Sequence, residues 1–241
     1  MGGDLNVWWR LGVPLVVPIV RLLFRTRVAG VHHVPLSGPG ILAFNHISVL
    51  DGPCIAIETA WRRRRATRFL VAVEIFAKRI PGWFLRRYRQ IPIRRGRRDA
   101  GALDEAIATI RGGALAAIAP EGAVNPDPDH LQRVRSGIAR IALPTGAAVI
   151  PVGIWGTHHR LPRGRRSWGR PIRPRLAIVY GEPIEPQGDV SEPDDVDAFV
   201  EIVRRRLEEQ VASARSLAGN HPDRLASGGP GYGGIGGGGR T

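Results

Sequence analysis

Short apolar runs alternate with helix-period segments through most of the chain. The apolar runs end in polar, glycine or proline residues, which is typical of buried strands. Such strands are expected at residues 41–44, 68–73, 90–93, 114–119, 147–156 and 175–181. Helices are expected at residues 51–61, 81–88, 100–110 and 136–143, the last ended by Pro144 and Gly146. This alternation predicts an α/β fold in which helices flank a mostly parallel central sheet.

The clearest pattern of an amphipathic helix lies near the C-terminus. Apolar residues recur there at helical spacing, while arginines and glutamates fill the other positions. The apolar positions are Val196, Phe199, Val200, Val203, Leu207 and Val211. Ser191 suits the N-cap of this helix. Beyond Ser227 the chain reads GGPGYGGIGGGGRT, which cannot bury enough apolar surface to offset the entropy of ordering, so we expect disorder there.

An apolar segment at residues 7–24 precedes the alternating region. It contains Arg10, Arg21 and two prolines, whereas a helix that spans a bilayer needs about 20 mostly apolar residues. We interpret it as an interfacial membrane segment, with Trp8 and Trp9 at the level of the lipid headgroups and the arginines on anionic lipid. A core helix broken by proline is the alternative. The expected organisation is a membrane-anchoring segment at 1–27, a main domain at 28–214 and a glycine-rich tail at 215–241.

The charge narrows the choice of partners. The 35 lysines and arginines outnumber the 21 aspartates and glutamates, which gives a formal net charge of +14. Such an excess favours nucleic acid, anionic lipid headgroups or phosphorylated small molecules. The basic residues are spread among apolar segments and match no nucleic-acid-binding motif, so no nucleic-acid partner is expected. A single cysteine, Cys54, excludes an internal disulfide framework.

The stretch FNHISVLDG carries the clearest candidate chemistry, because His46 precedes Asp51 by five residues. Each helical residue turns by about 100°, so five residues place two side chains about 140° apart on one helix. If the two side chains meet, His46 lies in the turn after the preceding strand and Asp51 lies in the first turn of the next helix. Asp51 would then hold one ring nitrogen, and the other could take a proton from a hydroxyl. The alternative is a loop histidine followed by an aspartate that caps a helix.

Four segments resemble, in order, the motif blocks of the glycerolipid acyltransferases, the lysophosphatidic acid acyltransferase family with its HxxxxD motif. The segment NHISVLDG is similar to the NHxxxxD signature, and IPIRRGRRDAG is similar to a second block with an arginine after a short strand. The segment AIAPEGA resembles an FPEGTRS block, and AAVIPVGIWGTH resembles a closing strand. The resemblance covers residues 28–181 and implies a glycerol-3-phosphate acyltransferase-like fold.

The resemblance also implies a reaction. The chain contains no HExxH, CxxC or GxxxxGK(S/T) motif, so no metal and no cofactor are expected. His46, oriented by Asp51, would deprotonate an acceptor hydroxyl that attacks the thioester of acyl-CoA or an acyl-carrier protein. Arg95 and its neighbour Arg94 would bind the acceptor phosphate. The substrate site would be completed by Glu121 and Gly122. The implied product is phosphatidic acid from 1-acylglycerol-3-phosphate (lysophosphatidic acid), made in phospholipid biosynthesis by a peripheral or monotopic enzyme at the cytoplasmic face of the cell membrane.

The third block departs from the family pattern. The chain reads EGAVN where the family reads EGTRS, so Ala123 and Val124 replace a threonine and an arginine. The arginine is expected to grip the acceptor phosphate, and losing such a contact weakens binding by about 1.5–3 kcal/mol. A glycolipid, polyol or other lysolipid acceptor is therefore an alternative, as is a basic lipid- or nucleic-acid-binding protein without activity. Ser48, the rival nucleophile, lacks a GxSxG elbow and is interpreted as structural.

Overall fold

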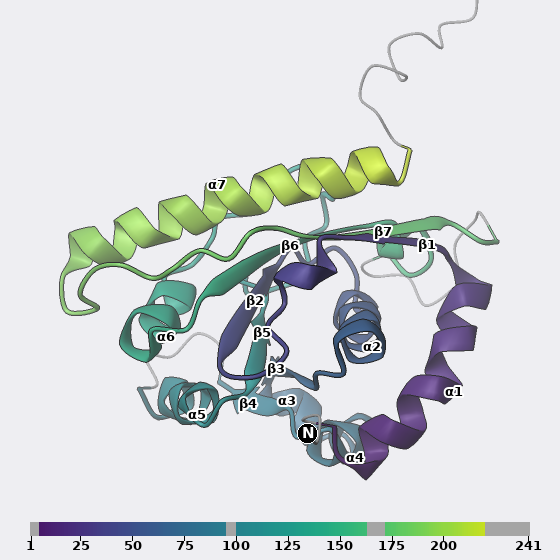
Figure 1. Ribbon diagram of the computed structural model, residues 1–241, viewed down its shortest axis with the longest axis horizontal. Coiled ribbons are helices and arrows are strands. Elements are labelled where there is room, and N and C mark those ends of the chain that lie inside the picture. The colour runs from purple at the N-terminus through teal and green to yellow at the C-terminus, as the bar shows by residue number, and fades with distance from the viewer. Residues whose placement is uncertain (1–4, 95–99, 163–171, 220–241) are drawn as a thin grey trace, which may run out of the picture.

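The computed structural model describes residues 5–94, 100–162 and 172–219 (Figure 1). Within these ranges, the centre is a seven-stranded sheet with the strand order β1-β7-β6-β2-β5-β3-β4. The strands are β1 Arg25–Ala29, β2 Gly40–Phe44, β3 Thr67–Ala72, β4 Ile91–Ile93, β5 Leu115–Ile118, β6 Val149–Trp155 and β7 Arg175–Tyr180. Neighbouring strands run parallel except β6 and β7, which are antiparallel. The predicted α/β fold with a mostly parallel sheet is confirmed.

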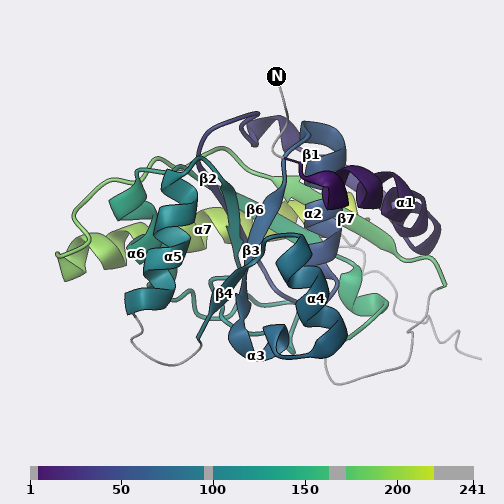
Figure 2. The same ribbon diagram turned by 90° about the horizontal axis from the view of Figure 1, so that it is seen from below.

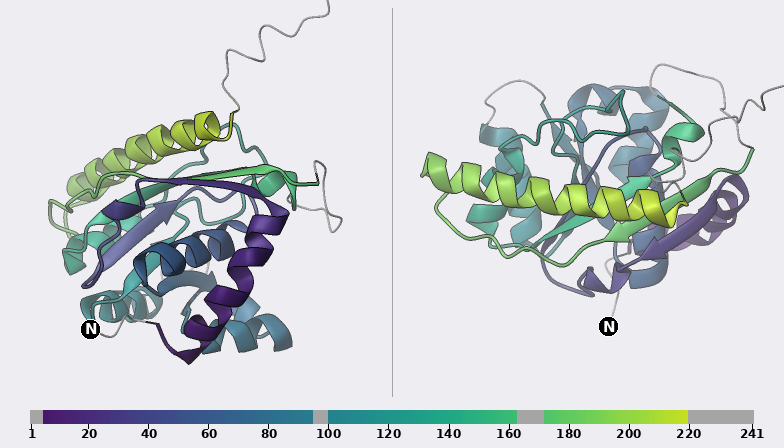
Figure 3. Two further views of the ribbon diagram at one scale, coloured as in Figure 1. Left: turned by 45° about the vertical axis from the view of Figure 1, so that its right-hand side comes forward. Right: turned by 90° about the horizontal axis from the view of Figure 1, so that it is seen from above.

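Helices cover both faces of this sheet (Figure 3). On one face lie α1 Val7–Leu23 and α2 Asp51–Arg63, and on the other lie α5 Ala100–Arg111, α6 Gly137–Thr145 and α7 Pro193–Leu217. The short helices α3 Val73–Phe76 and α4 Arg79–Arg87 lie beside β3 and β4 (Figure 2). Along β2, Leu42 and Phe44 pack into the core under α2, while Ile41 and Ala43 pack into the core under α6 and α7. Burial on both faces explains why this strand reads as an unbroken apolar run.

The expected N-cap of the last helix is wrong. The N-cap of α7 is Glu192, and the backbone N–H and hydroxyl of Ser191 instead donate to Asp189 Oδ1 at 2.8 and 2.7 Å. The reason is that Pro193 occupies the first helical position, where its fixed φ suits the helix and its missing N–H leaves no bond unmade.

Two helices also extend beyond their expected ends. Pro144 lies inside α6, and Gly146, with a left-handed φ of 63°, provides the C-cap. The last helix continues past the domain boundary expected at 214, because Ala214 and Ala218 are buried against Trp155. Residues 220–241, which include the predicted disordered tail, lie outside the described residues.

The N-terminal segment belongs to the same folded body as the sheet. The boundary expected after residue 27 falls inside β1, which pairs in parallel with β7 along its whole length. The preceding helix, α1, packs on α2 and is tied to it by an ion pair between Arg21 and the fully buried Glu58. The cause is that the edge of β7 offers a row of backbone donors and acceptors on which residues 25–29 pair as a further strand.

Two prolines do not break α1. Both Pro14 and Pro18 lie on its exposed side, where the carbonyl groups that lose a helical partner can reach solvent. On the opposite side, Trp9, Val13 and Val20 are buried. Placing Trp9 at headgroup level is therefore wrong, because its ring packs edge-on against Tyr88 at 5.0 Å and is only 4% exposed. In the part of the chain that the structure describes, no helix has the length and apolar character needed to cross a membrane.

Candidate active site

The His46 side chain and Asp51 meet at the end of the central strand. His46 follows β2, Asp51 is the first residue of α2, and His46 Nδ1 lies 3.0 Å from Asp51 Oδ2. The expected geometry, with His46 in the turn before the helix, is confirmed. A carboxylate only accepts hydrogen bonds, so the Nδ1 proton points at Asp51 and Nε2 carries the free lone pair. Among the residues described, Nε2 has no hydrogen-bond partner, and the His46 side chain is 18% exposed.

Asp51 organises the whole turn. Its carboxylate is fully buried, and Oδ2 also accepts from the backbone N–H groups of Ile47 at 2.7 Å and Ser48 at 2.8 Å. The other oxygen, Oδ1, accepts from the hydroxyl of Thr157, which follows β6. Thr157 is a positioning residue that sequence reasoning missed, although its place directly after the closing strand was a usable signal. With four donors on one carboxylate, Asp51 cannot rotate without breaking several hydrogen bonds.

Glu121 lies where it was expected, after β5 and beside the end of β2, and its carboxylate holds the backbone of His46. Its expected part in the substrate site stays a prediction. Its Oε1 accepts from the backbone N–H of His46 at 2.7 Å. Its Oε2 accepts from the Asn125 amide and from the Gln132 backbone N–H, both at 3.0 Å. Burial raises the pKa of the Glu121 carboxyl, and these hydrogen bonds oppose that shift. Two carboxylates thus fix His46, one through its ring and one through its backbone.

The glycine of the third block has an unexpected neighbour. Gly122 has a φ of +79°, and a Cβ added there would lie 2.9 Å from Arg135 Nε. The Arg135 side chain thus lies directly against Gly122, and the expected part of Gly122 in the substrate site stays a prediction. Arg135 was not singled out from the sequence, because it lies outside the four motif blocks.

Arg94, the one arginine of the second block among the described residues, is separated from His46 in the sheet. Arg94 is exposed at the end of β4, the last strand of the sheet, and both β5 and β3 lie between β4 and β2. Arg95 lies outside the described residues. The phosphate-binding role expected for these two residues stays a prediction.

The two rival nucleophiles near His46 are occupied or inaccessible. Ser48 is fully buried, and its hydroxyl donates to Leu161 O at 2.8 Å while accepting from Leu50 N–H. Cys54 is buried in the core, and desolvation raises the pKa of its thiol far above the usual value. A nucleophile needs a reachable atom beside its base. Neither residue meets this condition, which fits the structural interpretation of Ser48.

Comparison with known proteins identifies the class. A model of the acyltransferase family matches residues 25–155, and the chain belongs to this family, within the glycerolipid acyltransferase superfamily. A chloroplastic 1-acyl-sn-glycerol-3-phosphate acyltransferase of Arabidopsis thaliana is 27% identical over 164 residues, which are 67% of this chain and 44% of that protein. An N-acylphosphatidylethanolamine synthase of the same plant is 28% identical over 171 residues, covering 63% of this chain and 57% of that protein.

A solved structure shares the fold. The crystal structure of the 1-acyl-sn-glycerophosphate acyltransferase PlsC from Thermotoga maritima matches with a TM-score of 0.66 and 26% identity, over 83% of this chain and 80% of that chain. The chain spans less than two thirds of the length of the two plant relatives. The comparisons therefore establish the family and the fold, and leave the reaction to be argued from the site.

Proposed function

We propose that this protein is an O-acyltransferase that moves a fatty acyl group from acyl-CoA or an acyl-carrier protein to a hydroxyl of a lipid acceptor. The observation that carries the proposal is the His46–Asp51 pair at the end of β2, with Nδ1 held at 3.0 Å by a buried carboxylate and Nε2 unengaged. Such a pair supplies two members of a catalytic triad, the general base and the carboxylate that orients it. The third member, a protein nucleophile, is replaced by the acceptor itself.

The proposed mechanism proceeds by direct transfer. Nε2 of His46 removes the proton of the acceptor hydroxyl as its oxygen attacks the thioester carbonyl carbon. The new ester C–O bond forms, the C–S bond breaks, and the imidazolium returns the proton to the leaving thiolate. Asp51 keeps the ring in the required tautomer and stabilises the positive charge that develops on it. No acyl-enzyme is needed, which agrees with the buried hydroxyl of Ser48 and the buried thiol of Cys54.

For the acceptor, we propose 1-acylglycerol-3-phosphate, with phosphatidic acid as the product. Support comes from the names of the Arabidopsis thaliana and Thermotoga maritima proteins that this chain resembles, both of which act on acylglycerophosphate. The valine at position 124 argues in the other direction, because it removes a guanidinium that the family places in the third block. A glycolipid, polyol or other lysolipid is the competing acceptor.

A thiol-release assay tests both the proposed acyl transfer and the proposed acceptor. The purified protein is expected to release free thiol from long-chain acyl-CoA only when a hydroxyl lipid is present, because the acceptor oxygen is the nucleophile. The panel should contain 1-acylglycerol-3-phosphate, the matched 1-acylglycerol, a glycolipid and a lysophosphatidylcholine. Thiol release without any acceptor would indicate a thioesterase, and fastest release with a phosphate-free lipid would replace the proposed acceptor.

We further propose that the protein works at the surface of an anionic membrane. An exposed row of apolar side chains on α1 continues onto α4, and we call it the apolar face. It consists of Val7, Leu11, Leu15, Ile19, Leu22, Ile80, Trp83 and Phe84. The two helices are in contact, since the rings of Trp8 and Trp83 lie 5.2 Å apart and Asn6 donates to Arg87 O. Contiguous exposed apolar residues of this extent mark an interaction surface.

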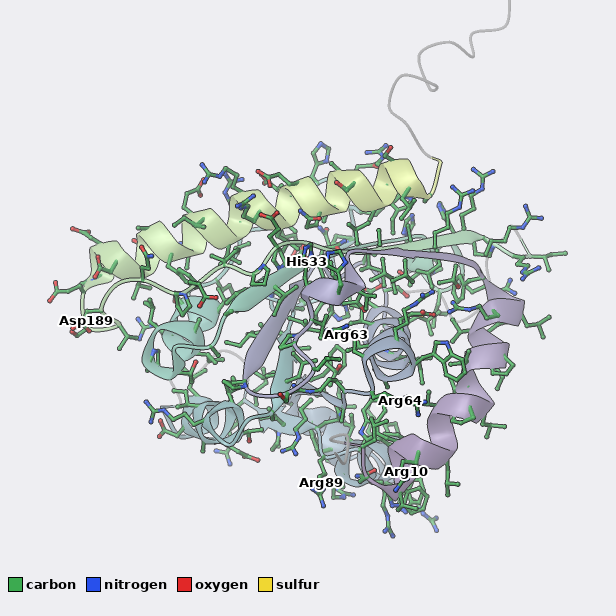
Figure 4. All side chains as sticks on the ribbon, in the orientation of Figure 1. Arg10, His33, Arg63, Arg64, Arg89 and Asp189 are labelled. Carbon is green, nitrogen blue, oxygen red and sulfur yellow. The ribbon has the colours of Figure 1, made fainter. Side chains whose placement is uncertain are left out.

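Charge favours a lipid surface as the occupant of the apolar face. Exposed arginines surround the junction of α1 and α4, among them Arg10 and Arg89, which are labelled at that end of the molecule in Figure 4. Arg87 also lies over the ring of Trp8 at 4.9 Å. Tryptophan and arginine beside apolar side chains are suited to the headgroup region of an anionic bilayer. We place the protein at the cytoplasmic face of the cell membrane, bound peripherally or monotopically, because arginine-rich regions next to membranes stay on that side.

Replacing Leu11 by glutamate is expected to weaken binding to vesicles that contain phosphatidylglycerol. Burying one leucine contributes about 1.5–3 kcal/mol, so the partition coefficient should fall about 10- to 100-fold. Co-sedimentation with vesicles measures it. The matched control is Leu36→Glu, because Leu36 has the same 67% exposure as Leu11 but lies between η1 Val31–His33 and β2. If both variants bind like the wild type, the apolar face is not the membrane contact.

A further inference from the structure

Arg135 lies against the loop that lacks the family arginine. In the third block, position 124 is valine. Arg135, which comes later in the chain just before α6, reaches the same loop, where its backbone N–H donates to Pro120 O at 3.0 Å and its Nε donates to Glu121 O at 3.2 Å. A guanidinium is therefore present at this loop, although it comes from a different part of the sequence.

Gly122 makes this placement possible. A Cβ at position 122 would lie 2.9 Å from Arg135 Nε and 3.2 Å from Arg135 Cδ, so any other residue there would displace the arginine side chain. The positive φ of +79° is a second reason for glycine at this position. The loop thus has a backbone shape that accommodates the Arg135 side chain.

One residue links Arg135 to the candidate base. The Glu121 carboxylate accepts from the backbone N–H of His46 at 2.7 Å, and the Glu121 carbonyl accepts from Arg135 Nε. The base and the guanidinium are consequently held on two parts of the same residue. A 1-acylglycerol-3-phosphate also carries its free hydroxyl and its phosphate on one three-carbon unit, so its recognition needs a base and a cation a short distance apart.

The far end of the guanidinium is available for a ligand. Arg135 is exposed, and its only hydrogen bonds to described residues use the backbone N–H and Nε. Its two terminal nitrogens, Nη1 and Nη2, offer paired donors in the geometry that phosphate oxygens accept. Anchoring through Nε also reduces the side-chain entropy that binding would otherwise cost.

We propose that Arg135 binds the phosphate monoester of the acceptor lipid and so takes over the contact that Val124 cannot make. The proposal rests on the proposed function for the nature of the acceptor. It assigns Arg135 to substrate binding and not to the proton transfer at His46. It also removes the main argument against a phosphate-bearing acceptor, since the missing arginine of the third block is replaced in space.

The test compares Arg135→Ala with Arg140→Ala, which removes the same charge from an exposed position on α6. For Arg135→Ala, the KM for 1-acylglycerol-3-phosphate should rise about 10- to 100-fold, which corresponds to one charged hydrogen-bonding contact. The kcat, the KM for acyl-CoA and the KM for the matched 1-acylglycerol should stay at wild-type values. Calorimetric titration with a short-chain 1-acylglycerol-3-phosphate, below its critical micelle concentration, should show the same loss of affinity without any turnover.

The possible results separate this proposal from the proposed function. Unchanged affinity and KM for the phosphate lipid would overturn the role of Arg135, as would an equal loss with the phosphate-free acceptor, which a purely structural role of the arginine would produce. A rise in the KM for acyl-CoA alone would assign Arg135 to the donor and overturn the acceptor assignment. Wild-type protein that transfers to no acceptor, yet binds the phosphate lipid in an Arg135-dependent way, would refute acyl transfer while supporting the phosphate site.

Discussion

Replacing His46 by alanine is expected to reduce acceptor-dependent thiol release by about 1,000-fold, because a positioned general base contributes about 100- to 10,000-fold. The folded state should change little. The imidazole makes one hydrogen bond, to Asp51, whose carboxylate keeps three other donors in the variant. The free energy of unfolding should therefore fall by only about 1 kcal/mol. Thiol release with a saturating acceptor and thermal unfolding measure the two effects.

The chain contains a matched control for this experiment. His130 pairs with Asp127 through the same atoms, Nδ1 and Oδ2, at 2.8 Å, but both side chains lie at the surface. Because Asp127 raises the pKa of His130, that ring also resembles an activated histidine on chemical grounds alone. We expect His130→Ala to retain full activity. If His46→Ala released thiol as fast as the wild type, the base would have to be assigned elsewhere.

Replacing Asp51 by asparagine is expected to cost nearly as much activity while keeping the shape of the turn. An asparagine oxygen in the place of Oδ2 still accepts from His46, Ile47 and Ser48, and its amide group can donate to the Thr157 hydroxyl. What disappears is the negative charge about 3–4 Å from the developing imidazolium. At an effective dielectric constant of about 20 this charge is worth about 4 kcal/mol, so kcat should fall about 1,000-fold.

The free energy of unfolding distinguishes the loss of the Asp51 charge from a loss of the structure of the site. Hydrogen bonds to a neutral amide are weaker than those to a carboxylate, so the free energy of unfolding of Asp51→Asn should fall by about 1–3 kcal/mol. The Asp51→Ala variant leaves three buried donors without an acceptor and should lose about 3–5 kcal/mol. Chemical denaturation measures both values. An active Asp51→Asn enzyme would show that the carboxylate serves the fold alone and not the catalytic step.

Much of the fold could be predicted because its signals are local. The run ILAF reads as a buried strand whichever strands flank it, and the spacing of Val196, Phe199 and Val203 reads as one face of a helix. The His46–Asp51 geometry belongs to the same class, since helical rotation requires the histidine to precede the helix if the two side chains are to meet. Where such predictions failed, a neighbouring residue changed the local balance, as Pro193 did at the start of α7.

The N-terminal helix shows the limit of periodicity. Apart from Arg10 and Arg21 its sequence is almost entirely apolar, so the pattern could not say which side packs against the rest of the protein and which side stays exposed. The structure decides this through Trp9, which packs against Tyr88, and through Arg21, which pairs with the buried Glu58. Glu58 lies on α2 and Tyr88 directly follows α4, and no helical period in α1 could have identified them.

The sequence by itself determined the order of the strands from β2 to β7 and of most helices between them, the turn that joins His46 to Asp51, and the resemblance to the acyltransferases, whereas β1 was not expected. Only the tertiary structure placed Thr157 on Asp51, Glu121 on the His46 backbone and Arg135 beside Gly122. The first two contacts join residues 106 and 75 positions apart, and they exist because β6, β2 and β5 are neighbours in the sheet with their carboxyl ends at one edge. The third forms within the connection between β5 and α6, where Arg135 returns to the loop at Gly122. Periodicity reports which face of a segment is buried, whereas the identity of its neighbours is set by strand order, which no single segment encodes.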